Sequence, residues 1–251
     1  MKKYLSIILV LLAVAMAAGP AQSFTFNDID FWVGSGSNRA ALVVQWFDPR
    51  MENALVWGYR WDGEASGEDM MTAIAGACDI RSSNNGAVVY TITGADSRLG
   101  AQLTTWSGFG GDKTLFGIGY DLDNDGGFAY VNGADETGHA ADADDLYFEG
   151  WYNGFWSYWV EDDGDNIIGN NMTFSNWGMS ARTLSNGSID LWGWDDDLDS
   201  FFGGGDGIGQ PVGPYAAATA PVPIPGAVLL LSTGLLRLAG MRRRREWVAG
   251  Q

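Results

Sequence analysis

The chain has 251 residues, enough for one domain with a closed hydrophobic core, and its 31 acidic and 14 basic residues give a formal net charge of −17. An acidic surface of this kind repels nucleic acids and anionic lipid headgroups, so we expect neither as a partner. The single cysteine excludes an intrachain disulfide, and the single histidine, His139, excludes a zinc site built on several histidines.

The first 23 residues have the three-part layout of a secretory signal peptide. Lys2 and Lys3 precede an apolar run, and small residues follow it up to an expected cleavage after Ser23. The apolar run is shorter than the roughly 20 residues that a membrane-spanning helix needs, although an uncleaved anchor is the alternative. We therefore expect export by the Sec machinery.

Residues 24–201 are expected to form one β-rich extracytoplasmic domain. Short runs rich in β-branched and aromatic residues alternate with Gly, Asn and Asp clusters, which is typical of strands joined by turns. These runs are ALVVQWF, ALVWGYRW, AVVYTIT, TLFGIGY, FAYVN, GFWSYWV and SIDLWGW. One helix is predicted at about residues 67–78, because Ser66 can cap it and Glu68 and Asp69 suit its first turn. The expected fold class is mainly β, a β-rich α+β domain: either an antiparallel sheet or sandwich that carries the helix, or a β-grasp-like sheet wrapped around it.

The stretch DLDNDGGF carries the clearest chemical signal. Asp121, Asp123 and Asp125 alternate and precede Gly126, as in the first half of a calcium loop, where the carboxylates converge and the glycine permits the turn. Position twelve of such a loop holds a bidentate acid, but Asn132 stands there in this chain. A calcium site therefore needs a further acid from elsewhere. The nearest candidates are Asp142, Asp144 and Asp145.

This interpretation makes Ca²⁺ the expected cofactor. The alternative is a solvated Asn-Asp-Gly turn that binds no ion. Under either interpretation, the strands TLFGIGY and FAYVN are expected to form a hairpin around the turn.

The stretch GWYNGFWSYWV has aromatic residues on both faces of a predicted strand, which favours a core strand covered on both sides. The alternative is a ligand platform on which a sugar ring or a planar macrocycle stacks. The residues of that platform would be Trp151, Tyr152, Trp156 and Tyr158.

No nucleophile motif, phosphate-binding loop or zinc motif is present in the sequence, so we expect a protein without catalytic activity. His139 lies in a polar stretch, where a solvated histidine is expected. Acid clusters at residues 161–165 and 195–199 leave a calcium-dependent glycan hydrolase as an alternative, because paired carboxylates catalyse glycoside hydrolysis.

Residues 202–221 are rich in Gly, Pro and small side chains and are expected to be a linker. An apolar run of about 18 residues then begins at Ile224, which is just long enough for a transmembrane helix. The four arginines after it belong on the cytoplasmic side by the positive-inside rule. The domain before the run is therefore expected outside the cytoplasm.

Residues 222–251 resemble the PEP-CTERM sorting signal, in its VPxPGA variant, of exported proteins from polysaccharide-producing Gram-negative bacteria. Ile224 stands where the name-giving variant has Glu, and Arg237 interrupts the apolar run. The resemblance implies a transient inner-membrane anchor facing the periplasm, which an exosortase removes to release the protein to the cell surface or the medium. The matching residues are Pro223, Pro225, Gly226, Arg242, Arg243 and Arg244.

The order of WGYRWDG, the helix, VVYTITG, GFWSYWVED and GMSARTLSNGSIDLWGW is similar to that of the small surface domain related to the C-terminal domain of transcobalamin. Trp156, Tyr158 and Trp159 take the place of its aromatic strand, and residues 184–189 approximate its closing turn. This resemblance implies a β-grasp-like fold and a corrinoid ligand.

These observations together predict an exported, non-catalytic surface or extracellular-matrix protein with an acidic, aromatic-rich ligand-binding domain. Exopolysaccharide and corrinoid are the ligands considered. A corrinoid-binding surface module is one alternative, and a calcium-dependent carbohydrate-binding module or glycan hydrolase is the other.

Overall fold

The computed structural model describes residues 24–79, 88–91, 94–105, 111–132, 138–150, 154–162, 164, 167, 172–196 and 209–221. The chain divides into two units, Met1–Ala220 and Pro221–Gln251, and all the elements below belong to the first. The expected signal peptide, transmembrane helix and sorting signal lie outside the described residues. Within the described ranges, no helix is long and apolar enough to cross a membrane.

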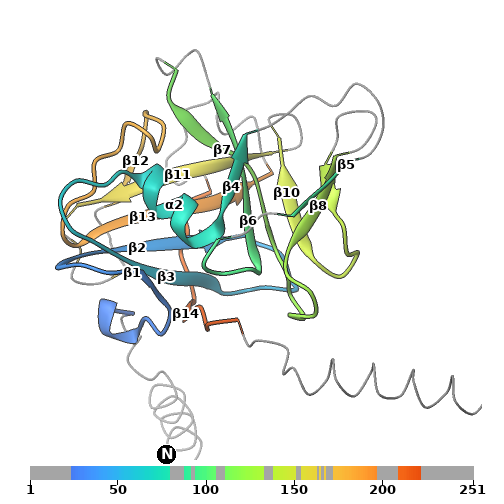
Figure 1. Ribbon diagram of the computed structural model, residues 1–251, viewed down its shortest axis with the longest axis horizontal. Helices are drawn as coiled ribbons and strands as arrows, with labels where there is room; N and C mark the ends of the chain where they lie inside the picture. The colour runs from blue at the N-terminus through green and yellow to red at the C-terminus, as the bar shows by residue number, and fades with distance from the viewer. Residues whose placement is uncertain are drawn as a thin grey trace, which may run out of the picture. The chain divides into compact units, whose positions relative to one another are not determined.

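The largest sheet has seven strands and mixes parallel with antiparallel pairs (Figure 1). Six strands run in the order β1-β3-β2-β13-β11-β12, and β14 pairs with β3 outside this path. β2 is antiparallel to β3 but parallel to β13, which is antiparallel to β11. The strand bounds are β1 Trp32–Gly34, β2 Asn38–Gln45, β3 Ala54–Trp61, β11 Phe155–Glu161, β12 Thr173–Phe174, β13 Ser188–Asp195 and β14 Tyr215–Ala217.

Two smaller sheets complete the domain, one of four strands in the order β10-β7-β6-β4 and one of three in the order β5-β8-β9. The mainly β fold class is therefore confirmed, although the pairs β1–β3, β14–β3, β13–β2 and β4–β6 are parallel where antiparallel sheets were expected. The bounds are β4 Ala77–Asp79, β5 Val88–Thr91, β6 Leu99–Thr105, β7 Lys113–Tyr120, β8 Ala129–Asn132, β9 Gly138–Ala140 and β10 Leu146–Glu149.

The helix α2, Gly67–Ala75, begins where the sequence predicts. The Ser66 hydroxyl accepts a hydrogen bond from the Asp69 amide, and the Asp69 carboxylate accepts one from the Ser66 amide, so a capping box fixes the first turn. The helix ends three residues before the predicted position 78, because Gly76 has a φ of 64° and the chain continues into β4.

The main core lies between the seven-stranded sheet, α2 and the four-stranded sheet, whose strands cross those of the larger sheet in Figure 1. It contains Trp57 of β3, Met70 of α2, Ile118 of β7 and Trp192 of β13. A second cluster covers the opposite face of the seven-stranded sheet and includes Phe26, from the 3₁₀ helix η1, Phe26–Asp28. Because both faces are covered, residues 40–44 of β2 are continuously apolar rather than alternating.

A buried ion pair joins three parts of the domain. Asp96, which is fully buried, accepts hydrogen bonds from the Trp57 indole at 2.9 Å and from the Arg98 Nε at 3.0 Å. Arg98 also donates to the carbonyl and the hydroxyl of Thr219. Both charges of the Asp96–Arg98 pair are hydrogen-bonded. The pair therefore connects the start of β6 to β3 and to the segment after β14.

The end of the expected linker is part of the folded domain. β14 pairs with Ala54–Val56 of β3, and the Ala218 amide donates to the Val56 carbonyl at 2.9 Å. The expectation of a linker up to residue 221 is therefore wrong for β14. The backbone groups at this edge of β3 need hydrogen-bond partners, and β14 supplies them, which the composition of the segment does not reveal.

Candidate metal centre

The stretch DLDNDGGF connects β7 to β8, but these two strands belong to different sheets. β7 is paired by β10 on one side and β6 on the other, whereas β8 pairs with β5 and β9. The expected hairpin is therefore wrong, because neither edge of β7 is available to β8. The stretch is instead a crossover loop between two sheets.

Asp121 organises this loop from a buried position with 1% of its surface exposed. Its Oδ1 accepts a hydrogen bond from the Asn124 amide at 2.6 Å, and its Oδ2 accepts one from the Gly127 amide at 2.7 Å. Asn124 and Gly127 adopt left-handed backbone angles, with φ of 57° and 85°. The expectation that Gly126 permits the turn is therefore wrong, since its φ is not positive and a Cβ there would meet open space.

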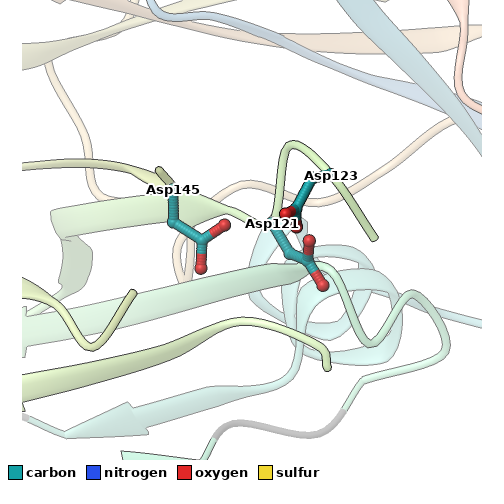
Figure 2. A group of neighbouring side chains, drawn as sticks. All are labelled: Asp121, Asp123 and Asp145. Carbon is teal, nitrogen blue, oxygen red and sulfur yellow. The ribbon is translucent and has the colours of Figure 1, made fainter. Parts of the chain in front are cut away.

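Asp145 approaches the loop from the turn between β9 and β10, and 7% of its surface is exposed. Its Oδ1 accepts a hydrogen bond from the Leu122 amide at 3.2 Å, which holds the two segments together. One carboxylate oxygen from each of Asp121, Asp123 and Asp145 lies within 4.8 Å of the others. Figure 2 shows Asp121 and Asp123 side by side on the loop, with Asp145 opposite them.

Of the three acids that the sequence suggested as the further ligand, only Asp145 lies near the loop aspartates. Asp142 and Asp144 are exposed, and the Asp142 carboxylate accepts a hydrogen bond from the Asp144 amide at 2.9 Å. Asp125 is also exposed and lies outside the group of three carboxylates. Asp125, Asp142 and Asp144 were all expected as ligands, but none of them belongs to the group. Only Asp145 lies close to Asp121 and Asp123.

The electrostatics of the group reflect crowded negative charge. Burial, and then the charges of Asp121, Asp142 and Asp123, raise the pKa of Asp145 to about 6. The pKa of Asp123 is raised as well, by desolvation first and then by the charges of Asp125 and Asp121. A divalent cation between the carboxylates would remove this repulsion.

Arg50 lies beside the group but forms no ion pair with its three carboxylates. Its Nη1 donates to the backbone carbonyl of Asp145 at 3.4 Å, while its Nε pairs with the carboxylate of Asp48 at 3.0 Å. The three carboxylates therefore remain available to an ion, because each oxygen that accepts a backbone hydrogen bond has a second lone pair.

The aromatic strand β11 belongs to the core. Trp156 and Tyr158 have 5% and 4% of their surfaces exposed, so neither presents a ring face to a ligand in this structure. The Tyr158 ring stacks on Trp192 at 4.1 Å, and its hydroxyl donates to the buried carboxylate of Asp190 at 2.6 Å. The burial of these two residues agrees with the favoured interpretation of a core strand, and the alternative of a ligand platform is wrong at both positions, because both faces of β11 are covered. The expected partners Trp151 and Tyr152 lie outside the described residues.

The buried carboxylates Asp96 and Asp190 were not singled out from the sequence. Asp190 lies in β13 between two apolar residues and is held by Arg182 at 3.2 Å as well as by Tyr158. Burial raises the pKa of Asp190, and the positive charge of Arg182 opposes the rise. Both carboxylates accept several hydrogen bonds within the core, and this indicates a structural role.

No protein-family model, no curated protein sequence and no solved structure matches the chain.

Proposed function

We propose that this protein is an exported, non-catalytic surface or matrix protein whose domain binds calcium between Asp121, Asp123 and Asp145. The observation that carries the metal part is the convergence of three carboxylate oxygens, from two separate segments, within 4.8 Å of one another. The export part rests on the sequence at the two ends of the chain, which resembles a signal peptide and a PEP-CTERM sorting signal.

Calcium is the ion that fits this donor set best. Carboxylate oxygens favour hard cations, and Ca²⁺ accepts six to eight oxygen ligands in flexible arrangements, so backbone carbonyls and water can complete the shell. Mg²⁺ demands a tighter octahedron and gives up its water reluctantly. With three carboxylates, we expect a dissociation constant of about 10⁻⁴ to 10⁻³ M, as for extracellular modules.

A thermal scan tests the calcium proposal. At a calcium concentration of about 1 mM, this affinity stabilises the fold by about 0.4 to 1.4 kcal/mol, which is a shift of a few degrees in melting temperature. We expect EDTA to lower the melting temperature of the purified protein by that amount, and calcium to restore it more effectively than magnesium.

Two matched variants locate the site. Asp123→Asn is expected to abolish the calcium response, whereas Asp125→Asn removes the same charge from the same loop outside the group of three and is expected to retain it. Identical melting curves with and without calcium in the unaltered protein would contradict the proposal. Loss of the response in Asp125→Asn alone would assign the ion to a different ligand set.

The proposal includes two processing steps, export across the inner membrane and removal of the C-terminal segment, which other proteins of the producing bacterium carry out. Sec export and an exosortase are its partners, with the inner membrane as a transient location and the cell surface or medium as the final one. Exopolysaccharide is the surrounding matrix in such hosts. A corrinoid ligand is not part of the proposal, because Trp156 and Tyr158 are buried.

A further inference from the structure

The cationic side chains of the domain are not all partnered in the same way. Six Lys and Arg residues lie in the described ranges, and four of them pair with carboxylates. Arg39 and Arg60 have no carboxylate partner among the described residues. The four ion pairs are Arg50–Asp48 at 3.0 Å, Arg98–Asp96 at 2.9 Å, Lys113–Glu68 at 3.0 Å and Arg182–Asp162 at 2.6 Å.

These two arginines are direct neighbours. Arg39 of β2 and Arg60 of β3 are cross-strand partners in the antiparallel register, so their side chains leave the same face of the sheet about 5 Å apart. Like charges in such a pair destabilise a sheet. Both residues are half-buried rather than extended into solvent, so water screens this repulsion only in part.

Aromatic rings hold both guanidinium groups in place. The Arg39 Cζ lies 4.6 Å from the ring centroid of Phe26, and the Arg60 Cζ lies 4.4 Å from that of Trp32. The two rings are themselves 6.4 Å apart, and Trp32 lies against Gly58, where a Cβ would come within 2.4 Å of its ring. Stacking occupies the faces of a guanidinium and leaves the N–H donors at its edge directed sideways.

The nearest carboxylate along the chain does not use these donors. Asp62 accepts hydrogen bonds from both the amide and the hydroxyl of Ser37, each at 3.0 Å. These hydrogen bonds lower the pKa of Asp62. The two guanidinium groups therefore come from neighbouring positions on β2 and β3, each lies against an aromatic ring, and neither pairs with a carboxylate among the described residues.

We propose that the Arg39–Arg60 pair binds the carboxylate of a small, singly charged ligand, that is, a small monocarboxylate. Two planar guanidinium groups match a carboxylate, which each can bind with paired N–H donors. Without its two terminal segments the chain keeps 30 acidic and 7 basic residues, a charge near −23, so polyanions and further copies of the chain are repelled. A single carboxylate on a neutral body largely escapes that repulsion, because charges beyond about 8 Å are screened at physiological salt. The site is independent of the calcium proposal.

The test is an NMR titration of the full chain, with D-glucuronate as the probe and the arginine Nε–Hε signals as the readout. We expect glucuronate and acetate to shift the Arg39 and Arg60 signals, and glucose, which lacks a carboxylate, to leave them unchanged. Arg39→Gln and Arg60→Gln are each expected to weaken binding about tenfold or more, because each removes charged hydrogen bonds. Lys113→Gln removes the same charge elsewhere and is expected to leave the affinity unchanged.

Arg39→Lys and Arg60→Lys keep the charge without the planar fork, and we expect them to bind weakly as well while they retain the fold. A glucuronate response no larger than that of glucose would overturn the proposal, as would an equal response in the Arg39→Gln/Arg60→Gln double variant. Stronger binding of a sulfated polyanion, or dimerisation through this face, would also overturn the proposal, because the Arg39–Arg60 pair would then bind another kind of partner.

Discussion

At the scale of single residues, the three carboxylates of the candidate metal centre differ in how they are held. Asp121 is buried and fixed by two backbone amides, Asp145 is buried and held by one, and Asp123 is exposed. The loop is therefore shaped by Asp121 without any ion. A bound ion would chiefly reduce the electrostatic repulsion that the carboxylates of Asp123 and Asp145 add to the loop.

The raised pKa of Asp145 gives the calcium response a pH dependence. In the calcium-free protein this pKa is about 6, above the ordinary value of 3.8. The ionised carboxylate thus destabilises the fold above pH 6, and the penalty disappears as the pH falls through 6 towards 4. Calcium needs the ionised form, so protons compete with it over the same range. We expect the melting-temperature shift caused by calcium to be largest near pH 7.5 and to shrink at pH 5.

Melting curves with calcium and with EDTA at several pH values measure this effect. Asp145→Asn serves as the control, because it lacks the titrating group and is expected to show no calcium response at any pH. A calcium shift as large at pH 5 as at pH 7.5 would contradict the assignment of Asp145 as a ligand.

At the scale of elements, the crossover loop depends on how closely β7 packs against the strands beside it. Phe128 ends the loop with 1% of its surface exposed, and its ring lies over Gly119 of β7. A Cβ at Gly119 would come within 2.0 Å of that ring and 2.7 Å of the Leu146 carbonyl. The absence of a side chain at this position therefore sets the path of the loop that carries Asp121 and Asp123.

Gly119→Ala is expected to destabilise the fold by about 1 to 3 kcal/mol, because the added methyl group overpacks a tight contact. It should also weaken calcium binding by displacing Phe128 and the loop before it. Urea denaturation and a calcium titration measure the two effects. Gly126→Ala is the matched control in the same loop, where a Cβ meets nothing within 4 Å, and its stability should change by less than about 0.5 kcal/mol. Equal effects of the two variants would contradict this account.

At the scale of the whole molecule, contacts distant in sequence hold the sheets together. Arg98 connects Asp96 to Thr219, and β14 completes the edge of β3 that β1 leaves uncovered. These contacts involve residues before Pro221. The first of the two units therefore contains the groups that fix its C-terminal strand.

This organisation makes a prediction about sorting. If an exosortase removes the tail, the native protein from its host should be lighter than a chain that ends at Gln251 and should still contain β14. A chain truncated after Pro221 should melt at the same temperature as the full chain. A chain truncated after Val212 should melt several degrees lower, because Arg98 loses its contacts with Thr219 and the edge of β3 at residues 54–56 loses its partner strand β14.

Intact-mass measurement of the native protein and thermal scans of the two truncated chains are the tests. A native species that still ends at Gln251 would contradict the sorting proposal and leave a permanent anchor. Equal melting temperatures for the two truncations would show that β14 does not stabilise the domain.

The sequence by itself determined the features that depend on neighbouring residues. The start of α2 follows from Ser66 and Asp69, which satisfy each other's backbone amides within one turn. The mainly β class follows from β-branched and aromatic runs between turn residues, as in β2 and β3. The loop from Asp121 to Asp125 stood out as a metal candidate because its acids alternate within a few residues.

Only the tertiary structure decided which distant groups meet. Asp145 joins Asp121 while Asp142 and Asp144 remain exposed, and only the packing of the turn before β10 against the crossover loop separates these three acids. Trp156 and Tyr158 are core residues because α2 and the four-stranded sheet pack against their face of the seven-stranded sheet. The sequence could not show this, because an aromatic-rich strand is typical both of a core and of a binding platform. The parallel pairing of β13 with β2 joins residues about 150 positions apart, and backbone hydrogen bonds carry no side-chain signature by which a sequence would disclose their partner.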